Sequence, residues 1–446
     1  MRTVVKAGVV LAAALALLAG GAALDLRGRE SEDADGRAVA GVASGSALLR
    51  PAVTARALGS SIAALQDRLR SVPQDWRGFA TLGLAYVAQA RVTADPSWYP
   101  KAEGALRESL RLHPEDNVEA LLGLGALALA RHDFEDALAR GRAALDLDPF
   151  DANAYGVVGD ALLEIGRYDE AFEAFQTMVD TRPDLASYAR ASYARELLGD
   201  VPGAIEAMRL AYEAAGSTSD AAWAAAQLGE LEFGRGDVEA AARWFERGRD
   251  LEPDSSANLA GLARVAWADG DAGLAIDRYA ELVAMDPAVE HLAALGDLYA
   301  TTGRRSEARD QYAVVEATRS LARANGVNVD LEVALFDADH GDPRAALAAA
   351  EAEWARRRSV HVADAYGWAL FANGRYEEAA HALDRALSLG ARNATFLFHA
   401  GMIERARGHE DAALRLLREA LATNPHFSIL HATTAETVVA ELEAAR

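Results

Sequence analysis

The sequence lacks cysteine altogether and contains very little lysine. Without cysteine the chain can form no disulfide, supply no thiol nucleophile and carry no lipid on a lipobox cysteine. Its only lysines are Lys6 and Lys101, so arginine provides nearly all of the positive charge. Acidic residues outnumber basic ones, and the formal net charge is −22. This excess would repel phosphate backbones and anionic lipid headgroups, so we expect no nucleic acid and no membrane surface as a partner.

The amino terminus is typical of an export signal. Arg2 and Lys6 precede an apolar run over residues 7–18, and Ala23 offers a cleavage point after small residues. The alternative is a short uncleaved anchor, because the apolar run extends slightly further and barely suffices to span a bilayer. Both interpretations place the rest of the chain outside the cytoplasm, since the positive charges stay inside. We therefore predict a signal peptide or membrane anchor over residues 1–23.

Two further regions follow this segment. Residues 24–59 are rich in Gly, Ala and Ser and have little periodicity, which predicts a flexible tether. Residues 60–446 have apolar side chains at a period of 3.6, which predicts helices throughout. Glycines recur in this region every 33–38 residues, at Gly166, Gly199, Gly236, Gly270, Gly303, Gly341, Gly374 and Gly408. Each glycine is expected just after a first helix, and each regularly spaced proline just after a second helix.

The spacing and the marked residues resemble the tetratricopeptide repeat. The clearest copy is residues 152–185, which carries Tyr155, Val158-Gly159, Leu162, Gly166, Ala171, Phe175 and Pro183 at the family's positions. The resemblance implies an all-α solenoid of helical hairpins that winds as a right-handed superhelix. We predict about ten repeats within residues 76–427, a lone helix before them at 60–73 with Ser60 as its N-cap, and a capping helix at 433–445.

Some repeats depart from the pattern. The first carries the insertion "RVTADPSWYP" between its helices, the second helix of the seventh is long, and the eighth is the poorest match. A binding loop, a hinge or simple sequence drift would each explain such departures.

The resemblance also implies where a ligand would bind, because the first helices of this family line a concave face. The side chains predicted to line that groove are mainly aromatic and acidic: Tyr193, Trp223, Phe233, Trp267, Trp368, Phe371, Phe398, Glu119, Asp160, Glu196, Glu230, Asp297 and Asp364. The few basic ones are Arg77, Arg264 and Arg405, and His361 also falls at a groove position. For each aromatic residue the alternative is packing against the next helix. Aromatic anchors bury a large area at a low entropic cost, which suits the binding of a peptide.

The charge of these residues restricts the partner. The best-known ligand of the family is the acidic C-terminal tail of a chaperone, held by lysines and asparagines. Here Lys101 is the only lysine in the repeats, and the groove acids would repel such a tail. A partner segment with apolar and basic side chains fits better.

Catalytic and metal-binding patterns are weak. The sequence contains no G-x-S-x-G, no phosphate-binding loop and no G-x-G-x-x-G. The segment "DADHGDP", with Asp337, Asp339, His340 and Asp342, is expected to be a solvated polar turn, and it lacks the glycine of an EF-hand loop. His361 lies three residues before Asp364, as a ligand contact or a surface pair, whereas His426 and His431 have no acidic neighbour in the sequence. We predict no enzymatic activity, no cofactor and no metal.

These observations favour a non-enzymatic scaffold outside the cytoplasm that binds a protein or peptide in its groove. Two alternatives remain open. The stretch "SIAALQDRLRSVPQDWRGFATLGLAYV" resembles the start of tetratricopeptide modules in cytochrome c maturation factors, which implies a chaperone for an exported protein. The concentration of histidines after His291 is the one indication of a metal-handling accessory protein.

Overall fold

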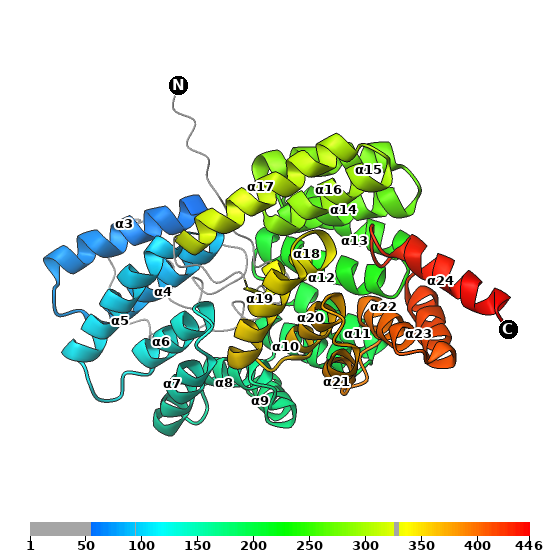
Figure 1. Cartoon of the computed structure of the whole chain (residues 1–446). Coiled ribbons are helices and arrows are strands. Elements are labelled where there is room, and N and C mark those ends of the chain that lie inside the picture. Colours follow the sequence, from blue (N-terminus) through cyan, green and yellow to red (C-terminus); the bar gives the residue numbers. More distant parts are fainter. Residues whose placement is uncertain (1–54, 94, 325–329) are drawn as a thin grey trace. The chain divides into compact units, whose positions relative to one another are not determined.

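The structure, a computed structural model, describes residues 55–93, 95–324 and 330–446 (Figure 1). This part of the chain contains 22 α-helices, one short 3-10 helix and no strand. The first element is α3 (Ala55–Ser71), and ten helical pairs follow it. The pairs are α4 (Trp76–Thr93) with α5 (Tyr99–Leu112), α6 (Val118–Ala130) with α7 (Phe134–Leu147), α8 (Ala152–Glu164) with α9 (Tyr168–Thr181), α10 (Leu185–Leu197) with α11 (Val201–Glu213), and α12 (Thr218–Gly234) with α13 (Val238–Leu251).

The remaining pairs continue the same alternation to the carboxyl end. They are α14 (Ser256–Ala268) with α15 (Ala272–Met285), α16 (Val289–Thr301) with α17 (Arg305–Ala324), α18 (Asp330–His340) with α19 (Pro343–Arg356), α20 (Val360–Ala372) with α21 (Tyr376–Ala386), and α22 (Ala394–Ala406) with α23 (Glu410–Thr423). The last helix is α24 (Ala432–Ala444). The predicted all-α helical-repeat solenoid is confirmed. We call the helix nearer the amino terminus of each pair its first helix.

The helix boundaries correct the sequence prediction in one place. Helix α3 begins at Ala55, so Ser60 lies inside the helix and does not cap it, and residues 55–59 are helix instead of tether. Helix α24 begins and ends within one residue of the predicted capping helix. The insertion in the first repeat forms the 3-10 helix η1 (Pro96–Trp98), and α17 is the long helix expected in the seventh repeat. The predicted signal or anchor at 1–23, and the tether up to residue 54, lie outside the described residues.

Aspartate defines the start of several second helices. The side chains of Asp133, Asp200, Asp237 and Asp271 each accept a hydrogen bond from the backbone N–H three residues later. Such N-caps satisfy a backbone donor that has no partner within the helix, and each contributes about 1 kcal/mol. In three of these four pairs the aspartate directly follows a marker glycine, which explains the repeated Gly-Asp dipeptide after a first helix.

Small residues allow the two helices of a pair to cross closely. A side chain at Gly159 would collide with the ring of Phe175, and one at Gly229 would collide with the ring of Phe245. Both phenylalanines are at most 2 % exposed, so the bulky residue of the second helix fills the space that glycine leaves on the first. This packing explains why the small and bulky positions of each repeat recur together.

The described residues divide into two compact units, which we treat separately. The N-terminal unit comprises the described residues up to 163 together with 167–190, and the C-terminal unit comprises 164–166 and the described residues from 191 to 446. Leu58, Ile62, Leu82 and Leu106 belong to the main core of the N-terminal unit. The C-terminal unit has several smaller cores, one for each group of neighbouring repeats.

Within the described part of the chain, no helix combines the length and the apolar character that crossing a membrane requires.

Candidate functional site

Four of the predicted groove residues lie in the core of the C-terminal unit. Phe233 is 4 % exposed, Asp364 3 %, Trp368 6 % and Phe398 1 %. A ligand on the surface would not reach them, so their prediction as groove residues is wrong. The helical period alone cannot distinguish the face that a neighbouring repeat covers from the face that stays open, because both faces carry large side chains.

Trp368 shows what these buried residues do instead. Its indole N–H donates to Asp339 Oδ1 over 2.7 Å, and its ring stacks on Phe371 and His399 at centroid distances of 4.7 and 4.1 Å. His399 Nδ1 in turn lies 2.9 Å from Asp364 Oδ1. The Asp364 carboxylate therefore holds a histidine of the next first helix, and it is not the partner of His361 that the sequence suggested.

Six other predicted residues are partly accessible to solvent: Tyr193, Trp223, Arg264, Trp267, His361 and Phe371. Tyr193 of α10 lies parallel to His361 of α20 at 6.3 Å, and the edge of the same imidazole meets Phe396 at 5.4 Å. Burial among these rings lowers the pKa of His361, so the imidazole is neutral at pH 7. The structure thus brings together aromatic residues from first helices that lie far apart in the sequence.

Two predicted groove carboxylates, Glu196 and Glu230, are accessible on the first helices α10 and α12. Glu230 of α12 has a side chain that is 41 % exposed, and it forms an ion pair with Arg264 of α14. The Arg264 guanidinium also lies over the Phe233 ring, 4.9 Å from its centroid. Glu196 of α10 is exposed and has no ion-pair partner among the described residues. Solvent reaches part of this side chain, but the protein packed around the carboxylate desolvates it and raises its pKa from the usual 4.5 to about 7, and the Glu230 carboxylate adds to this effect.

The "DADHGDP" segment is less solvated than the sequence suggested. Asp337 is 5 % exposed and accepts two hydrogen bonds from the Arg319 guanidinium, at 2.7 and 2.8 Å. His340 Nε2 lies 3.0 Å from Asp297 Oδ1, and the Tyr312 hydroxyl donates to that same oxygen over 2.8 Å. The prediction of a fully solvated turn is wrong, since these side chains tie α18 to α16 and α17.

His431 is a second correction in this region. The sequence around it contains no acid, yet His431 Nε2 lies 3.1 Å from Asp339 Oδ1, 92 residues earlier in the chain. Long-range pairs of this kind leave no local trace in the sequence. Among the residues that the structure describes, no group of three or more His, Asp or Glu side chains is arranged to hold a metal ion.

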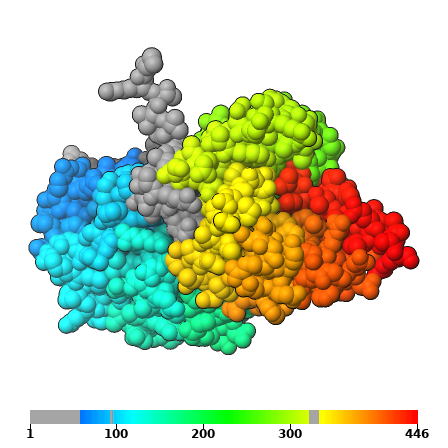
Figure 2. Space-filling view, in the orientation of Figure 1, coloured from blue at the N-terminus to red at the C-terminus, as the bar shows by residue number. Residues whose placement is uncertain are grey.

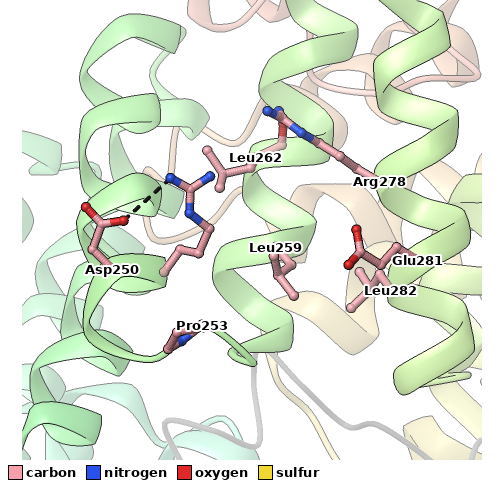
Figure 3. Close-up of a pocket in the computed structure, with 8 residues that line it drawn as sticks. Asp250, Pro253, Leu259, Leu262, Arg278, Glu281 and Leu282 are labelled. Atoms are coloured by element: carbon pink, nitrogen blue, oxygen red, sulfur yellow. Dashed lines mark hydrogen bonds and ion pairs between the residues drawn. The ribbon is translucent and has the colours of Figure 1, made fainter.

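A cavity of about 570 Å³ lies between α13, α14 and α15 of the C-terminal unit (Figure 3). Leu259, Leu262 and Leu282 give it an apolar lining, while Arg249, Asp250, Arg278 and Glu281 add charged groups. Arg278 donates to the Leu262 carbonyl over 2.6 Å, so its guanidinium is already hydrogen-bonded to the backbone. None of the predicted groove residues lines this cavity.

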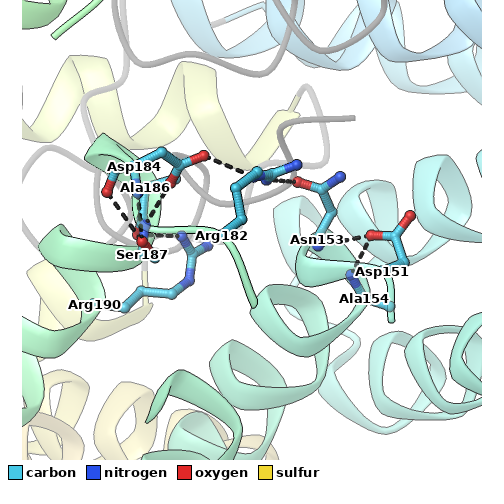
Figure 4. Close-up of polar contacts among 8 residues, drawn as sticks. All are labelled: Asp151, Asn153, Ala154, Arg182, Asp184, Ala186, Ser187 and Arg190. Atoms are coloured by element: carbon cyan, nitrogen blue, oxygen red, sulfur yellow. Dashed lines mark hydrogen bonds and ion pairs between the residues drawn. The ribbon is translucent and has the colours of Figure 1, made fainter. Parts of the chain in front are cut away.

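Polar contacts in the N-terminal unit are of a different kind (Figure 4). Arg182 follows α9 and reaches both Asp184 and Asn153, while Asp184 and Ser187 cap the start of α10 reciprocally. Arg190 of α10 donates to Asp160 of α8 over 2.9 Å and also to a backbone carbonyl, and both charged side chains are 3 % exposed. Asp160 is therefore a structural residue and does not line a groove.

Comparison with known families agrees with this architecture. One family model, described as tetratricopeptide repeat, matches residues 99–152, 122–186, 157–220 and 261–323, and a second model of the same description matches 293–434. Together they cover more than half of the chain. The chain belongs to the tetratricopeptide-repeat family.

Solved structures of other tetratricopeptide-type folds are similar at low identity. The human IFIT1 dimer with PPP-AAAA is 13 % identical over 86 % of this chain and 91 % of its own, with a TM-score of 0.46. Yeast Tom70 is 13 % identical over 87 % of this chain and 96 % of its own, with a TM-score of 0.37. A thermophilic tetratricopeptide protein of Thermus thermophilus is 19 % identical over 43 % of this chain and 98 % of its own, with a TM-score of 0.37. No curated protein matches the sequence.

The C-terminal unit of this tetratricopeptide array also makes contacts between distant repeats. A side chain at Gly199, which follows α10, would collide with the carbonyl oxygen of Gly390, which follows α21. A side chain at Gly236, which follows α12, would approach the Thr423 carbonyl oxygen at 3.0 Å. The turns of the fourth and fifth repeats therefore pack against the ends of second helices in the ninth and tenth repeats. Figure 2 shows the red carboxyl-terminal segment beside the green to yellow-green part of the surface.

Proposed function

We propose that this tetratricopeptide protein is a non-enzymatic scaffold that binds a protein segment on the first-helix face of its C-terminal unit. The observation that carries this proposal is the exposed Glu196 carboxylate, unpaired among the described residues, in the electrostatic neighbourhood of Glu230. Partly exposed aromatic rings lie on the same helices, with Tyr193 on α10 and Trp223 on α12. Acidic groups beside aromatic rings suit a partner with basic and apolar side chains.

A labelled peptide of alternating arginine and leucine is a suitable probe. The double variant Glu196→Gln, Glu230→Gln should bind it about ten-fold more weakly than the wild type, as expected when ~1.4 kcal/mol of charge attraction is lost. Binding by the wild type should also weaken between low and moderate salt. Fluorescence anisotropy at two salt concentrations measures both effects.

The matched control is Glu239→Gln, Asp250→Asn. These side chains are 89 % and 74 % exposed and lie on the same unit's α13, so this variant loses the same charge elsewhere. Equal weakening in the two double variants would mean that the peptide follows the net charge of the chain, and the proposed site would then be abandoned.

We further infer a location outside the cytoplasm, on the strength of the charged and apolar amino terminus. The accompanying experiment is protease treatment of cells of the native host whose outer envelope has been made permeable while the cytoplasmic membrane stays closed. Degradation of the repeats under conditions that spare a cytoplasmic marker is the expected result, and protection equal to that of the marker contradicts it.

A further inference from the structure

The segment between α23 and α24, residues 424–431, lies on the first helices of much earlier repeats. Asn424 is 2 % exposed, and its side-chain amide donates to the Phe233 carbonyl oxygen over 2.9 Å, across 191 residues of sequence. Phe233 lies in the last turn of α12, where backbone carbonyls have no partner inside the helix. That carbonyl also accepts a hydrogen bond from the Gly236 backbone N–H over 2.9 Å, so the asparagine adds a second donor at the end of α12.

Two more side chains of the segment contact this surface. The ring of His426 meets the ring of Trp267, on α14, edge to face at a centroid distance of 5.9 Å. Ile429 packs against the apolar cluster of α14 to α16, which includes Leu295 and Leu298 and is bordered by Tyr299. One carboxamide thus contacts α12, one ring contacts α14, and one branched aliphatic side chain packs against the apolar cluster of α14 to α16.

Hydrogen bonds within the segment also help to fix its conformation. Asn424 Oδ1 accepts a hydrogen bond from the His426 backbone N–H over 2.8 Å, and Ser428 Oγ accepts one from the His431 N–H over 3.1 Å. Phe427 points to the other side, with its ring 5.4 Å from that of Phe398 on α22. A preformed turn that presents alternate side chains to a helical face is how a peptide ligand gains affinity at low entropic cost.

We propose that the face of α12, α14 and α16 is a second binding site, for a partner segment with a carboxamide, then an aromatic or imidazole ring, then a β-branched aliphatic side chain, and that residues 424–431 fill this site in cis. This proposal rests on the proposed scaffold function but uses other residues than Glu196 and Glu230. A partner would compete with a tethered segment whose effective concentration is on the order of mM, so the site binds strongly only when its own segment is released.

The test empties the site and offers the segment back as a separate molecule. The variant Asn424→Ala, His426→Ala, Ile429→Ser removes the three anchors and keeps Phe427 and His431, which attach the segment to α22 and α18. The probe is a labelled synthetic peptide of residues 423–431, TNPHFSILH, which contains no arginine or lysine. We expect the emptied variant to bind it about ten-fold or more tightly than the wild type does, because the tethered competitor is gone.

Three controls make the result specific. A peptide with alanine in place of the asparagine, the isoleucine and the first histidine should not bind. Adding Trp267→Ala to the emptied variant should reduce binding about ten-fold, as loss of an aromatic anchor does. Phe150→Ser, a change at a ring that is 81 % exposed, should leave the behaviour of the wild type unchanged.

An emptied variant that keeps its helical circular dichroism and does not bind the peptide at about 1 mM would overturn the proposal, and the contact would then be packing alone. A wild type that dimerises, and loses the dimer when emptied, would assign the surface to a second copy and equally overturn it. If the emptied variant does not fold, the single variant Ile429→Cys provides the test instead. Because the chain has no other cysteine, thiol labelling of this variant reports only on position 429. Excess peptide should speed thiol labelling of that variant, and an unchanged rate contradicts the proposal.

The outcome is separable from that of the scaffold proposal. The arginine–leucine peptide reports on Glu196 and Glu230, and the TNPHFSILH peptide carries no positive charge except on its histidines. Failure of the second peptide with success of the first therefore removes only the site on α12, α14 and α16.

Discussion

Among the ion pairs that link the first helices of consecutive repeats, two, one in each unit, differ clearly in burial. Asp160 and Arg190, of α8 and α10, are both 3 % exposed and lie in the N-terminal unit. Glu230 and Arg264, of α12 and α14, are 41 % and 28 % exposed and lie in the C-terminal unit. Asp160 and Glu230 both directly follow the small residue at which the helices of their pair cross, Gly159 and Gly229 respectively.

The comparison shows that the same position of the repeat can carry a structural ion pair or an accessible one. Where a neighbour covers the pair, each charge depends on the other, because an unpaired buried ion is expensive. Where solvent reaches the pair, its contribution to stability is small and its charges stay available to a partner. Position in the repeat therefore does not predict function until burial is known.

The largest expected effect comes from breaking the buried pair. Asp160→Ala leaves the Arg190 guanidinium without its carboxylate and should destabilise the fold by about 3–5 kcal/mol. Urea unfolding followed by circular dichroism, together with hydrogen exchange in α8 and α10, measures the loss. Glu230→Ala is the matched change and should cost only ~0.2–1 kcal/mol. Similar losses in the two variants would break the comparison, and so would a larger loss for Glu230.

The turn glycines also differ in burial, because one turn is enclosed by another repeat and one is open. Gly199 and Gly303 have φ angles of 78° and 81°, so alanine is strained at both, by about 1–2 kcal/mol. Only Gly199 is closed in, by the Gly390 carbonyl, whereas a side chain at Gly303 meets nothing within 4 Å. Gly199→Ala should therefore cost about 1–3 kcal/mol more than Gly303→Ala, which thermal unfolding of both variants would measure. Equal costs would show that the two turns are equally free.

The smallest expected effect concerns the accessible carboxylates and is the pH dependence of peptide binding through Glu196. With its pKa raised to about 7, Glu196 is half protonated at neutral pH, and it gains its charge as the pH rises. Binding of the arginine–leucine peptide should strengthen by about two- to three-fold from pH 6 to pH 8, in line with ~0.2–1 kcal/mol for an accessible ion pair. Glu196→Gln should abolish this increase, and an unchanged increase in that variant would rule out Glu196 as its source.

The same carboxyl also affects stability, with the opposite sign. Since the folded pKa of Glu196 lies above the unfolded value near 4.5, its favourable contribution is complete below pH 4.5 and is lost as the pH rises through 7. Glu196→Gln should consequently gain in melting temperature relative to the wild type between pH 5 and pH 8. A constant difference between the two proteins over this range would contradict the raised pKa.

Much of the fold was predictable because its determinants are local. Marker glycines end the first helices, and seven of the eight have positive φ angles, Gly341 being the exception in the eighth repeat, which matches the pattern least. Helix α18 ends at His340, and Asp342 caps α19 immediately, so this turn needs no left-handed residue. Periodicity and turn chemistry over some ten residues are enough to predict such elements.

The candidate site was less predictable, since it depends on contacts between distant repeats. Trp267 and Trp368 read alike in the sequence, yet one is partly accessible and the other is 6 % exposed between α18 and α22. The contacts of Asn424 with Phe233 and of His431 with Asp339 span 191 and 92 residues. No local pattern encodes how far a later repeat reaches over an earlier one.

The hydrogen bond from Asn424 to the end of α12 has a consequence for how the protein comes apart. An open row of repeats frays from its tips, because each unit holds only its neighbours. Here the final helical pair is hydrogen-bonded to the fifth repeat, so it cannot unfold without also exposing the end of α12. Repeats five to ten should accordingly unfold as one cooperative unit. When the chain is pulled from its carboxyl end, these repeats should unfold together in a single step.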